Sequence, residues 1–354
     1  MSALRPARGG AYAFGRAVGT GGIGTGMLLR LDGDHTLGRN ESRSARLVPA
    51  KDYCKLHIIF HYLAVLLGAG QRDGFPVHPV GAVGSDPAGR ALLDEMAAAG
   101  MRMRHVAVVE ASATLFSVCF QYPDSTGGNI TAANNASAAV APEHVAACFA
   151  EAGAEPGRGL ALAVPEVPLE TRLALLGEAK RRGWFTVASL LSSEAAAFEA
   201  AGGYSLVDVL AVNVDEAAAI DGTAGATNST GRAVAERCAD KLLRLQPDMA
   251  LLVTDGPNGS YSYADGRLTF TPPLPAEAVG TAGAGDAFLA GTLAGLICGL
   301  PLRKNTEDRQ FGDTPLAGAV ELGTLLASLS VTSPNTIHER ADADQLYRWA
   351  SGNR

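Results

Sequence analysis

Short apolar stretches alternate with longer Ala- and Leu-rich stretches along most of the chain. Clear examples are "VHPVGAVG" before "DPAGRALLDEMAAAG", "GLALAVP" before "LETRLALLGEAKRRG", and "LVDVLAVN" before "VDEAAAIDG". The short runs indicate buried strands, and the longer stretches have the apolar spacing of helices. The alternation predicts βαβ units in a three-layer, doubly wound α/β fold with a mostly parallel sheet. Ligands bind at the carboxyl ends of the strands in such sheets.

Two segments interrupt this alternation. Residues 26–50 contain an apolar run, an Asp-Gly turn and a second, more polar extended run, and residues 114–131 alternate apolar and polar positions around Pro-Asp and Gly-Gly. Both patterns are typical of β-hairpins. We expect them to form a small β lid over the main domain, which would comprise residues 1–25, 51–113 and 132–354.

Composition and charge narrow the classes of protein. The chain has 354 residues, of which 47% are hydrophobic, and a formal net charge of -7, so we expect a large core and no nucleic-acid partner. Its five cysteines are widely spaced, which is typical of a reducing cytoplasm. The longest apolar run, "IIFHYLAVLLGAG", is too short for a bilayer, and the start lacks an apolar signal core, so we expect neither export nor membrane contact.

The stretch "GTAGAGDAF", residues 280–288, combines clustered glycines with a carboxylate just before a predicted helix. Glycines let backbone N–H groups converge, and a helix N-terminus adds partial positive charge, so this turn suits a phosphate or a developing anion. Asp286 falls in the first helical turn, where it could accept a proton from a hydroxyl that attacks the phosphate. Taken alone, Asp286 could equally cap the helix.

This stretch resembles the Gly-Ala-Gly-Asp signature of the ribokinase family, also called the PfkB family of carbohydrate kinases. Further matches follow the family's order over most of residues 75–300. In "VNVDEAAAI", Asn213 and Glu216 match an Asn-x-x-Glu motif, and "VTDGPNGS" and "VGAVGSDPAGRALLDEMAAAGM" match two further segments. The resemblance implies an enzyme that transfers the γ-phosphoryl group of ATP to an alcohol of a small-molecule acceptor.

The resemblance also implies roles for individual residues. Asp286 would be the general base, and Asn213 and Glu216 would organise Mg²⁺ through water. The amides that would form the anion hole belong to Ala282, Gly283, Ala284 and Gly285. The residues expected near the nucleotide are Thr254, Gly256, Gly259, Ser328 and Asn335. Without the resemblance, Asn213 and Glu216 could simply be a helix cap and a solvated glutamate in the first turn.

The sequence departs from the family pattern at several positions. Gly280 stands where the family usually has an Asp that helps hold a monovalent cation, so potassium activation is doubtful. Gly26 replaces the usual Asp after the first strand, while Lys55 and His57 lie where the family has a Gly-Gly turn and an Asn-bearing helix. Such a pocket favours an acceptor with negative charge, such as a sugar phosphate or sugar acid. Alternatively, Lys55 and His57 could lie at a solvated or paired helix start.

The lid adds a polar cluster in "TLGRNESR" that could close on such a ligand. The cluster contains Arg39, Asn40 and Arg43. Relatives often dimerise through the lid, and exposed strands give a physical reason to pair, so a homodimer is a further possibility.

Two other functions compete with this prediction. "GTGGIG", residues 19–24, matches a dinucleotide-binding fingerprint, but that fingerprint requires a helix directly after the glycines, and "TGMLLRLDGDHTL" follows instead. A catalytically inactive nucleotide- or sugar-binding or regulatory protein stays open because of the departures at Gly26, Cys54 and Gly280. The intact Asp286 and Glu216 favour an active kinase.

Overall fold

The computed structural model describes residues 3–6, 10–124, 126–152, 158–225, 229–303, 310–311, 314–315 and 318–352. The strands of its largest sheet are β1 (Ala17–Thr20), β4 (Val77–Gly84), β5 (Val106–Val109), β8 (Leu160–Ala163), β9 (Phe185–Ala188), β10 (Val209–Asn213), β11 (Ala250–Thr254), β12 (Ser260–Ala264) and β13 (Arg267–Thr271). This nine-stranded sheet has the order β13-β12-β11-β10-β9-β8-β1-β4-β5. Neighbours from β11 to β5 pair in parallel, and β12 and β13 form an antiparallel edge.

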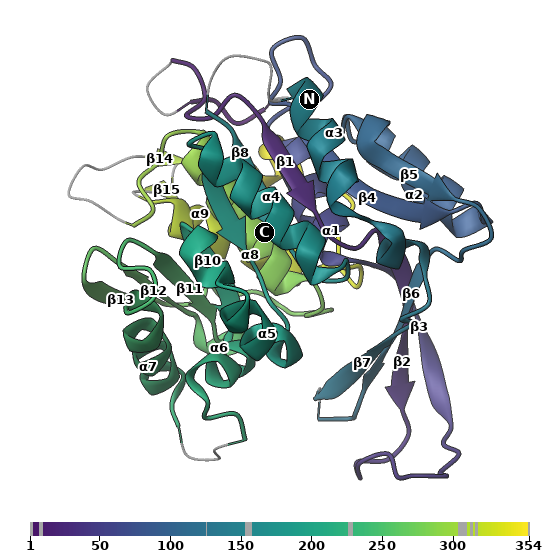
Figure 1. The fold of residues 1–354 in the computed structure, drawn as a ribbon. Helices are drawn as coiled ribbons and strands as arrows, with labels where there is room; N and C mark the ends of the chain where they lie inside the picture. Colours follow the sequence, from purple (N-terminus) through teal and green to yellow (C-terminus); the bar gives the residue numbers. More distant parts are fainter. Residues whose placement is uncertain are drawn as a thin grey trace.

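Helices cover both faces of this sheet (Figure 1). One face is covered by α1 (Lys55–Leu66), α2 (Pro87–Ala98), α8 (Ala284–Ile297), α9 (Ala319–Ser330) and α10 (Ala343–Ala350). The other is covered by α3 (Pro142–Ala152), α4 (Leu169–Arg181), α5 (Ala195–Ala200), α6 (Val214–Asp221) and α7 (Gly231–Leu243). Successive residues of β8 alternate between these two cores, because strand side chains point to opposite faces. The predicted three-layer α/β fold is confirmed.

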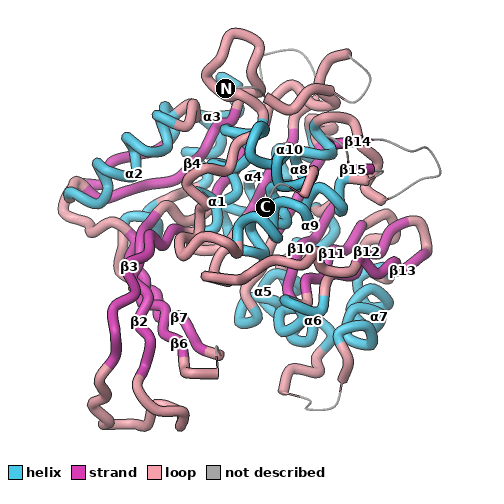
Figure 2. Tube along the Cα trace, turned by 180° about the vertical axis from the view of Figure 1, so that it is seen from behind, coloured by secondary structure: helices cyan, strands magenta, loops and turns pink. Residues whose placement is uncertain are grey.

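A second, smaller sheet projects from the main body (Figures 1 and 2). Its strands are β2 (Gly24–Leu31), β3 (Ala45–Tyr53), β6 (Leu115–Gln121) and β7 (Gly127–Thr131), in the order β3-β2-β6-β7. The pairs β2/β3 and β6/β7 are antiparallel, and β2 pairs with β6 in parallel. The predicted small β sheet is therefore present, built from the two segments that interrupt the βα alternation. The short strands β14 (Gln310–Phe311) and β15 (Thr314–Pro315) form a separate pair.

The glycines of "GTGGIG" connect two strands. β1 ends at Thr20 and β2 begins at Gly24, so no helix follows this segment. A dinucleotide-binding turn of the predicted competing kind is therefore not formed here. Among the helices in the described part of the chain, none is long and apolar enough to cross a membrane.

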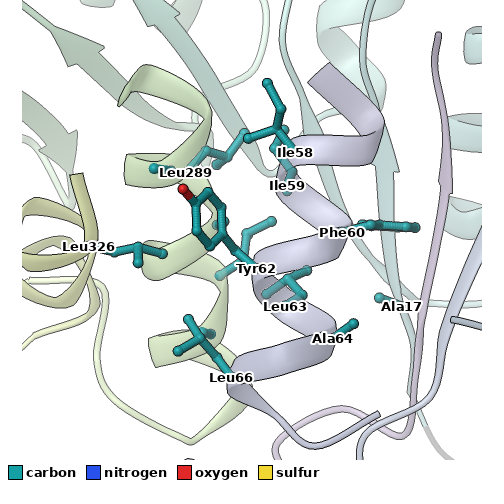
Figure 3. Close-up of a cluster of buried hydrophobic side chains, with 14 of the residues drawn as sticks. Ala17, Ile58, Ile59, Phe60, Tyr62, Leu63, Ala64, Leu66, Leu289 and Leu326 are labelled. Carbon is teal, nitrogen blue, oxygen red and sulfur yellow. The ribbon is translucent and has the colours of Figure 1, made fainter. Parts of the chain in front are cut away.

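The helix α1 is packed between the sheet and α8 (Figure 3). Phe60 points toward Ala17 of β1, and Tyr62 points toward Leu289 of α8 and Leu326 of α9. A Cβ on Gly19 of β1 would lie 2.4 Å from the Phe60 ring, so the close packing of α1 on β1 requires glycine there. This packing places the N-terminus of α1 beside the N-terminus of α8, where the candidate site lies.

Candidate active site

The glycine-rich turn leads directly into α8. This helix begins at Ala284, after Gly283, whose φ of 78° lies in the left-handed region. A Cβ on Gly283 would also lie 2.7 Å from the carbonyl oxygen of Thr336, so this position needs glycine for two reasons. Beside a Cβ built on Gly285, the nearest atom is the Thr254 hydroxyl oxygen at 3.9 Å, so the turn is open on that side. The turn therefore offers an accessible helix N-terminus of the kind that binds phosphate groups.

Asp286 lies in the first turn of α8 and faces Lys55, the first residue of α1. The Lys55 Nζ atom is 3.3 Å from Asp286 Oδ1, and the two side chains are 27% and 14% exposed. Burial raises the pKa of Asp286, and the Lys55 ammonium opposes this shift. The Asp286 carboxylate in turn raises the pKa of Lys55. The structure therefore brings two of the predicted site residues together as a partly buried ion pair.

Glu166 lies in the same cluster and was missed by the sequence analysis. The Lys55 ammonium, the Cys54 thiol and the Lys55 backbone N–H favour its ionised form, while Oε2 is buried with no partner among the described residues. Burial raises the pKa of Glu166 to about 7. Its φ of 78° is strained for a residue with a Cβ, as is common at functional sites. The available signal was its position just beyond the carboxyl end of β8, where ligands of parallel sheets bind.

A second missed carboxylate, Asp52, lies across the strand pair from Gly26. The two residues are register partners in β2 and β3, and a Cβ on Gly26 would lie 2.3 Å from Asp52 Oδ2. Asp52 is 8% exposed, and burial raises its pKa. The position where the sequence analysis noted a lost carboxylate is therefore filled by a carboxylate from the neighbouring strand.

Asn213 and Glu216 form a capping box at the start of α6. The Glu216 N–H donates to Asn213 Oδ1 over 2.8 Å, and the Asn213 N–H donates to Glu216 Oε2 over 2.9 Å. Glu216 is 8% exposed, so it is not the solvated glutamate of the alternative interpretation. Burial raises the pKa of Glu216, and Lys55 opposes that shift while Asp286 adds to it. Both residues therefore cap α6, and Glu216 also belongs electrostatically to the Asp286 cluster.

The carboxyl end of β11 lies beside the glycine-rich turn. Thr254 ends β11, and its hydroxyl is the atom that faces Gly285. A short 3-10 turn, Gly256–Asn258, follows, with φ values of 51° at Gly256 and 103° at Gly259. Glycine is required at Gly259, because a Cβ there would also lie 2.5 Å from a backbone oxygen of β13.

His57 lies away from this cluster. It is fully buried in α1 and lines a cavity of about 480 Å³ together with His61 and Glu95. Its ring packs against Tyr53 with centroids 4.5 Å apart. Burial lowers the pKa of His57 to about 3, so the ring is neutral. His57 therefore does not supply a second positive charge beside Lys55 and Asp286.

The C-terminal residues predicted near the nucleotide make protein contacts. The Ser328 hydroxyl donates to the Leu325 carbonyl over 2.8 Å and accepts from Trp349 Nε1 over 2.8 Å. Asn335 Oδ1 accepts the Lys51 N–H over 2.7 Å, and its amide nitrogen donates to Glu339. Asn335 therefore ties the C-terminal loop to β3.

The polar cluster in the small sheet is organised around Glu41. Arg43 Nε donates to Glu41 Oε1 over 2.7 Å, and Arg43 Nη1 donates to the His35 carbonyl over 2.7 Å. Arg39 is exposed, and Asn40 adopts a left-handed conformation with a φ of 61°. These residues lie in the loop between β2 and β3, at the end of the small sheet that points away from the main body (Figure 2). The structure does not bring them to the Asp286 cluster.

Gly280 lies against the C-terminal loop. A Cβ there would lie 2.8 Å from the carbonyl oxygen of Ser333 and 3.2 Å from Pro334. A side chain at this position would require the loop to move. Gly280 thus offers no side-chain oxygen for a monovalent cation and little room for one.

Comparison with known proteins shows the family of this chain. Residues 66–343 match the model of the pfkB family carbohydrate kinases. Over 98 residues the chain is 38% identical to a fructokinase from Klebsiella pneumoniae, a match that covers 27% of this chain and 29% of the fructokinase. The chain therefore matches less than a third of the length of this curated relative.

Solved structures share the fold over nearly the whole chain. A ribokinase from Arabidopsis thaliana, complexed with ribose and ATP, has a TM-score of 0.68 at 16% identity, covering 98% of this chain and 99% of the ribokinase. A nucleoside kinase from Burkholderia thailandensis, in complex with inosine, has a TM-score of 0.67 at 17% identity, covering 95% and 97%. At these identities the likeness shows the fold alone. The family model matches well over half of the residues of this chain, and the chain therefore belongs to the pfkB family of carbohydrate kinases.

Proposed function

We propose that this protein transfers the γ-phosphoryl group of ATP to a hydroxyl of a small, sugar-like acceptor, with Asp286 as the general base. The observation that carries this proposal is the position of Asp286 in the first turn of α8, beside an open glycine-rich turn and 3.3 Å from the Lys55 ammonium. Phosphoryl transfer needs positioning and charge neutralisation more than covalent chemistry, and this arrangement supplies both.

Each part of the turn has a distinct task in this proposal. The amides of Ala282, Gly283, Ala284 and Gly285 would bind the oxygens of the transferred group, helped by the α8 dipole. Asp286 would accept the proton of the attacking hydroxyl. Lys55 would hold Asp286 ionised and offset negative charge near the reacting atoms. When bound, magnesium-ATP supplies the phosphoryl group.

Asn213 and Glu216 fit a role in holding Mg²⁺ through water. Glu216 is a buried carboxylate of which one oxygen accepts the Asn213 N–H, and the capping box fixes both side chains. Carboxylate and amide oxygens suit a hydrated magnesium ion. In the described part of the chain, no three His, Cys, Asp or Glu residues lie close enough to hold a metal ion directly. Contact through water stays a prediction.

The nucleotide would lie along the carboxyl end of β11. Thr254, whose hydroxyl faces Gly285 of the glycine-rich turn, supports this position, and Gly256 and Gly259 follow in the 3-10 turn after β11. Ser328 and Asn335 would act indirectly, because their side chains hold α10 and β3 in position. Gly280 gives no support to a monovalent cation, so we expect the rate to be the same in potassium and choline salts at equal ionic strength.

The charges of the site do not support an anionic acceptor. That prediction depended on Lys55 and His57, and the structure pairs Lys55 with Asp286 and keeps His57 neutral in another cavity. The Lys55 ammonium already faces the carboxylates of Glu166, Glu216 and Asp286. A sugar phosphate or sugar acid would bring further negative charge close to these carboxylates, which would repel it. We therefore favour an uncharged polyhydroxyl acceptor.

A cytoplasmic location also stays a proposal. All of the chain's five cysteines are free thiols. Burial raises the pKa of Cys148, Cys238 and Cys298 to about 12, so these thiols stay protonated and unreactive. A reducing compartment is the simplest environment for such a chain.

ADP release from magnesium-ATP tests the proposed function. Purified protein is offered matched pairs of acceptors, each a free sugar or polyol and its phosphate or acid derivative. We expect turnover with an uncharged member and none with its charged partner. Turnover restricted to charged acceptors would reverse the charge argument. ATP binding without turnover on a broad panel would favour the alternative, a catalytically inactive nucleotide- or sugar-binding or regulatory protein.

A further inference from the structure

Asp52, Gly26 and Ser117 lie in one row across three strands of the small sheet. Gly26 of β2 pairs with Asp52 of β3 on one side and with Ser117 of β6 on the other. The Asp52 carboxylate extends over Gly26, where it accepts hydrogen bonds from Ser117 Oγ over 3.3 Å and from Cys119 Sγ over 3.5 Å. A Cβ on Gly26 would lie 2.3 Å from Asp52 Oδ2 and 2.6 Å from Ser117 Oγ. The glycine therefore makes room for the carboxylate.

The environment of Asp52 is costly for an ionised group. The residue is 8% exposed, and in the described part of the chain no lysine or arginine forms an ion pair with it. Its side-chain hydrogen-bond donors are a neutral hydroxyl and a neutral thiol, and the Tyr53 backbone N–H also favours its ionised form. Burying a carboxylate without a cation is unfavourable, and the sheet would be satisfied equally well by a neutral side chain. This cost indicates a task beyond holding the strands together.

Asp52 also lies near the proposed reaction centre, because it precedes Lys55, the first residue of α1, by three positions. Asp286 contributes to the raised pKa of Asp52, and the charges of Asp52, Glu166 and Asp286 all raise the pKa of the Cys54 thiol. These carboxylates come from the small sheet, the end of β8 and the start of α8.

The carboxylate is held in a fixed position relative to the glycine-rich turn. On one side of Asp52, the Lys51 N–H donates to Asn335 Oδ1 over 2.7 Å, and on the other the Tyr53 N–H donates to Thr336 Oγ1 over 3.0 Å. Thr336 is also the residue that packs against Gly283. The end of β3 is therefore bonded to the loop that supports the anion hole, and this rigidity suits a binding group.

We propose that Asp52 binds a hydroxyl of the acceptor. Its carboxylate fits over Gly26 because glycine has no side chain there. Asp52 would thereby select the acceptor and orient it for attack at the glycine-rich turn. This inference rests on the proposed kinase function. Asp52 would accept a hydrogen bond from one hydroxyl of the acceptor, while Asp286 accepts the proton of the reacting hydroxyl. An ionised carboxylate can accept hydrogen bonds but cannot donate them. The site would therefore prefer a polyhydroxyl substrate and disfavour one that presents an anion to β3.

Substitution of Asp52 tests the proposal with binding and turnover measured side by side. The probe is the uncharged acceptor that gives the highest turnover or, if none turns over, the one that calorimetry shows to bind. For Asp52→Asn we expect the acceptor KM or Kd to rise by tenfold or more, about 1.4 kcal/mol or more, because a charge-assisted hydrogen bond is lost. The Kd for ATP stays within about twofold, a change worth less than about 0.5 kcal/mol. The matched control, Asp34→Asn, changes an exposed aspartate in the loop between β2 and β3 and leaves both constants unaltered.

A second variant separates the charge of the side chain from its presence. Asp52→Glu keeps the carboxylate, so we expect it to retain more acceptor binding than Asp52→Asn. A purely structural role for Asp52 would instead lower the melting temperature of Asp52→Asn and leave acceptor binding intact. That result, or binding of no polyhydroxyl compound by the wild type, would overturn the inference. Acceptor binding that depends on Asp52, but without turnover, would count against the kinase activity alone.

Discussion

Lys55 determines how the acidic side chains of the site ionise. It lies 3.3 Å from Asp286 and interacts electrostatically with Glu216 and Glu166 as well. Burial raises the pKa of each of these carboxylates, and Lys55 opposes the shift in every case. The lysine therefore favours the ionised form of Asp286, which the proposed role as general base requires.

Replacing Lys55 by Met is expected to impair the base. Without the ammonium, burial acts unopposed on Asp286, so its pKa rises and a larger fraction is protonated at a given pH. We expect the acidic limb of the kcat profile to move to higher pH and the maximal rate to fall by about 10²-fold, as for loss of other groups that stabilise transferring charge. A profile of kcat against pH measures both effects. Lys55→Arg, which retains the charge, should leave the limb close to that of the wild type; an unmoved limb in Lys55→Met would contradict the account.

Glu166 is expected to destabilise the ligand-free fold at alkaline pH. Burial raises its pKa from 4.5 to about 7, so the folded state binds more protons than the unfolded state between these values. Stability is therefore favoured below pH 4.5 and falls as the pH rises toward about 7, by at most about 3 kcal/mol. Glu166→Gln should melt at a higher temperature than the wild type at pH 8 and show little difference at pH 4.5. The same difference at both pH values would show that the carboxylate charge is not responsible.

At the scale of elements, the site forms where the N-termini of α1 and α8 meet. α8 and its glycine-rich turn could be predicted, because the motif and the helical spacing are contiguous in the sequence. Asp52 and Glu166 could not be predicted in the same way. Their significance depends on a strand register and on a backbone turn that bring distant segments together. His57 was predicted in the site for a similar reason, because nothing in "KDYCKLH" shows which side of α1 faces the site.

Gly283 tests how strictly the turn depends on glycine. An alanine at Gly283 would adopt a φ of 78°, and its Cβ would lie 2.7 Å from the Thr336 carbonyl oxygen. We therefore expect Gly283→Ala to lower the free energy of unfolding by at least about 1–2 kcal/mol. Urea denaturation measures this loss. Gly285→Ala is the matched control for stability, since the nearest atom to its added Cβ is 3.9 Å away. Equal stability of the two variants would contradict the geometry of the turn.

At the scale of the whole molecule, the small sheet has two unlike faces. Gly26, Asp52 and Ser117 lie on the face turned toward the site. Strand alternation puts exposed apolar side chains on the other face, including Leu47 and Ile130, which are 65% and 63% exposed. The sequence predicted the two hairpins, but it could not show this division, because the face of a strand follows from register.

The apolar face makes a homodimer through the small sheet a testable proposal. We expect the wild-type protein to sediment as a dimer and the double variant Leu47→Lys, Ile130→Lys to sediment as a monomer, because two buried lysines would repel across the interface. Analytical ultracentrifugation distinguishes the two. A wild-type monomer at concentrations of about 100 µM, where contacts of even modest affinity persist, would contradict the proposal.

The most direct test of the central claim is the turnover of Asp286→Asn with the preferred acceptor and saturating magnesium-ATP. The asparagine keeps the shape of the side chain but cannot accept the proton of the attacking hydroxyl. The account predicts a fall in kcat of about 10²-fold or more, with ATP and acceptor still bound. Retention of more than a tenth of the wild-type kcat would contradict the assignment of Asp286 as the general base.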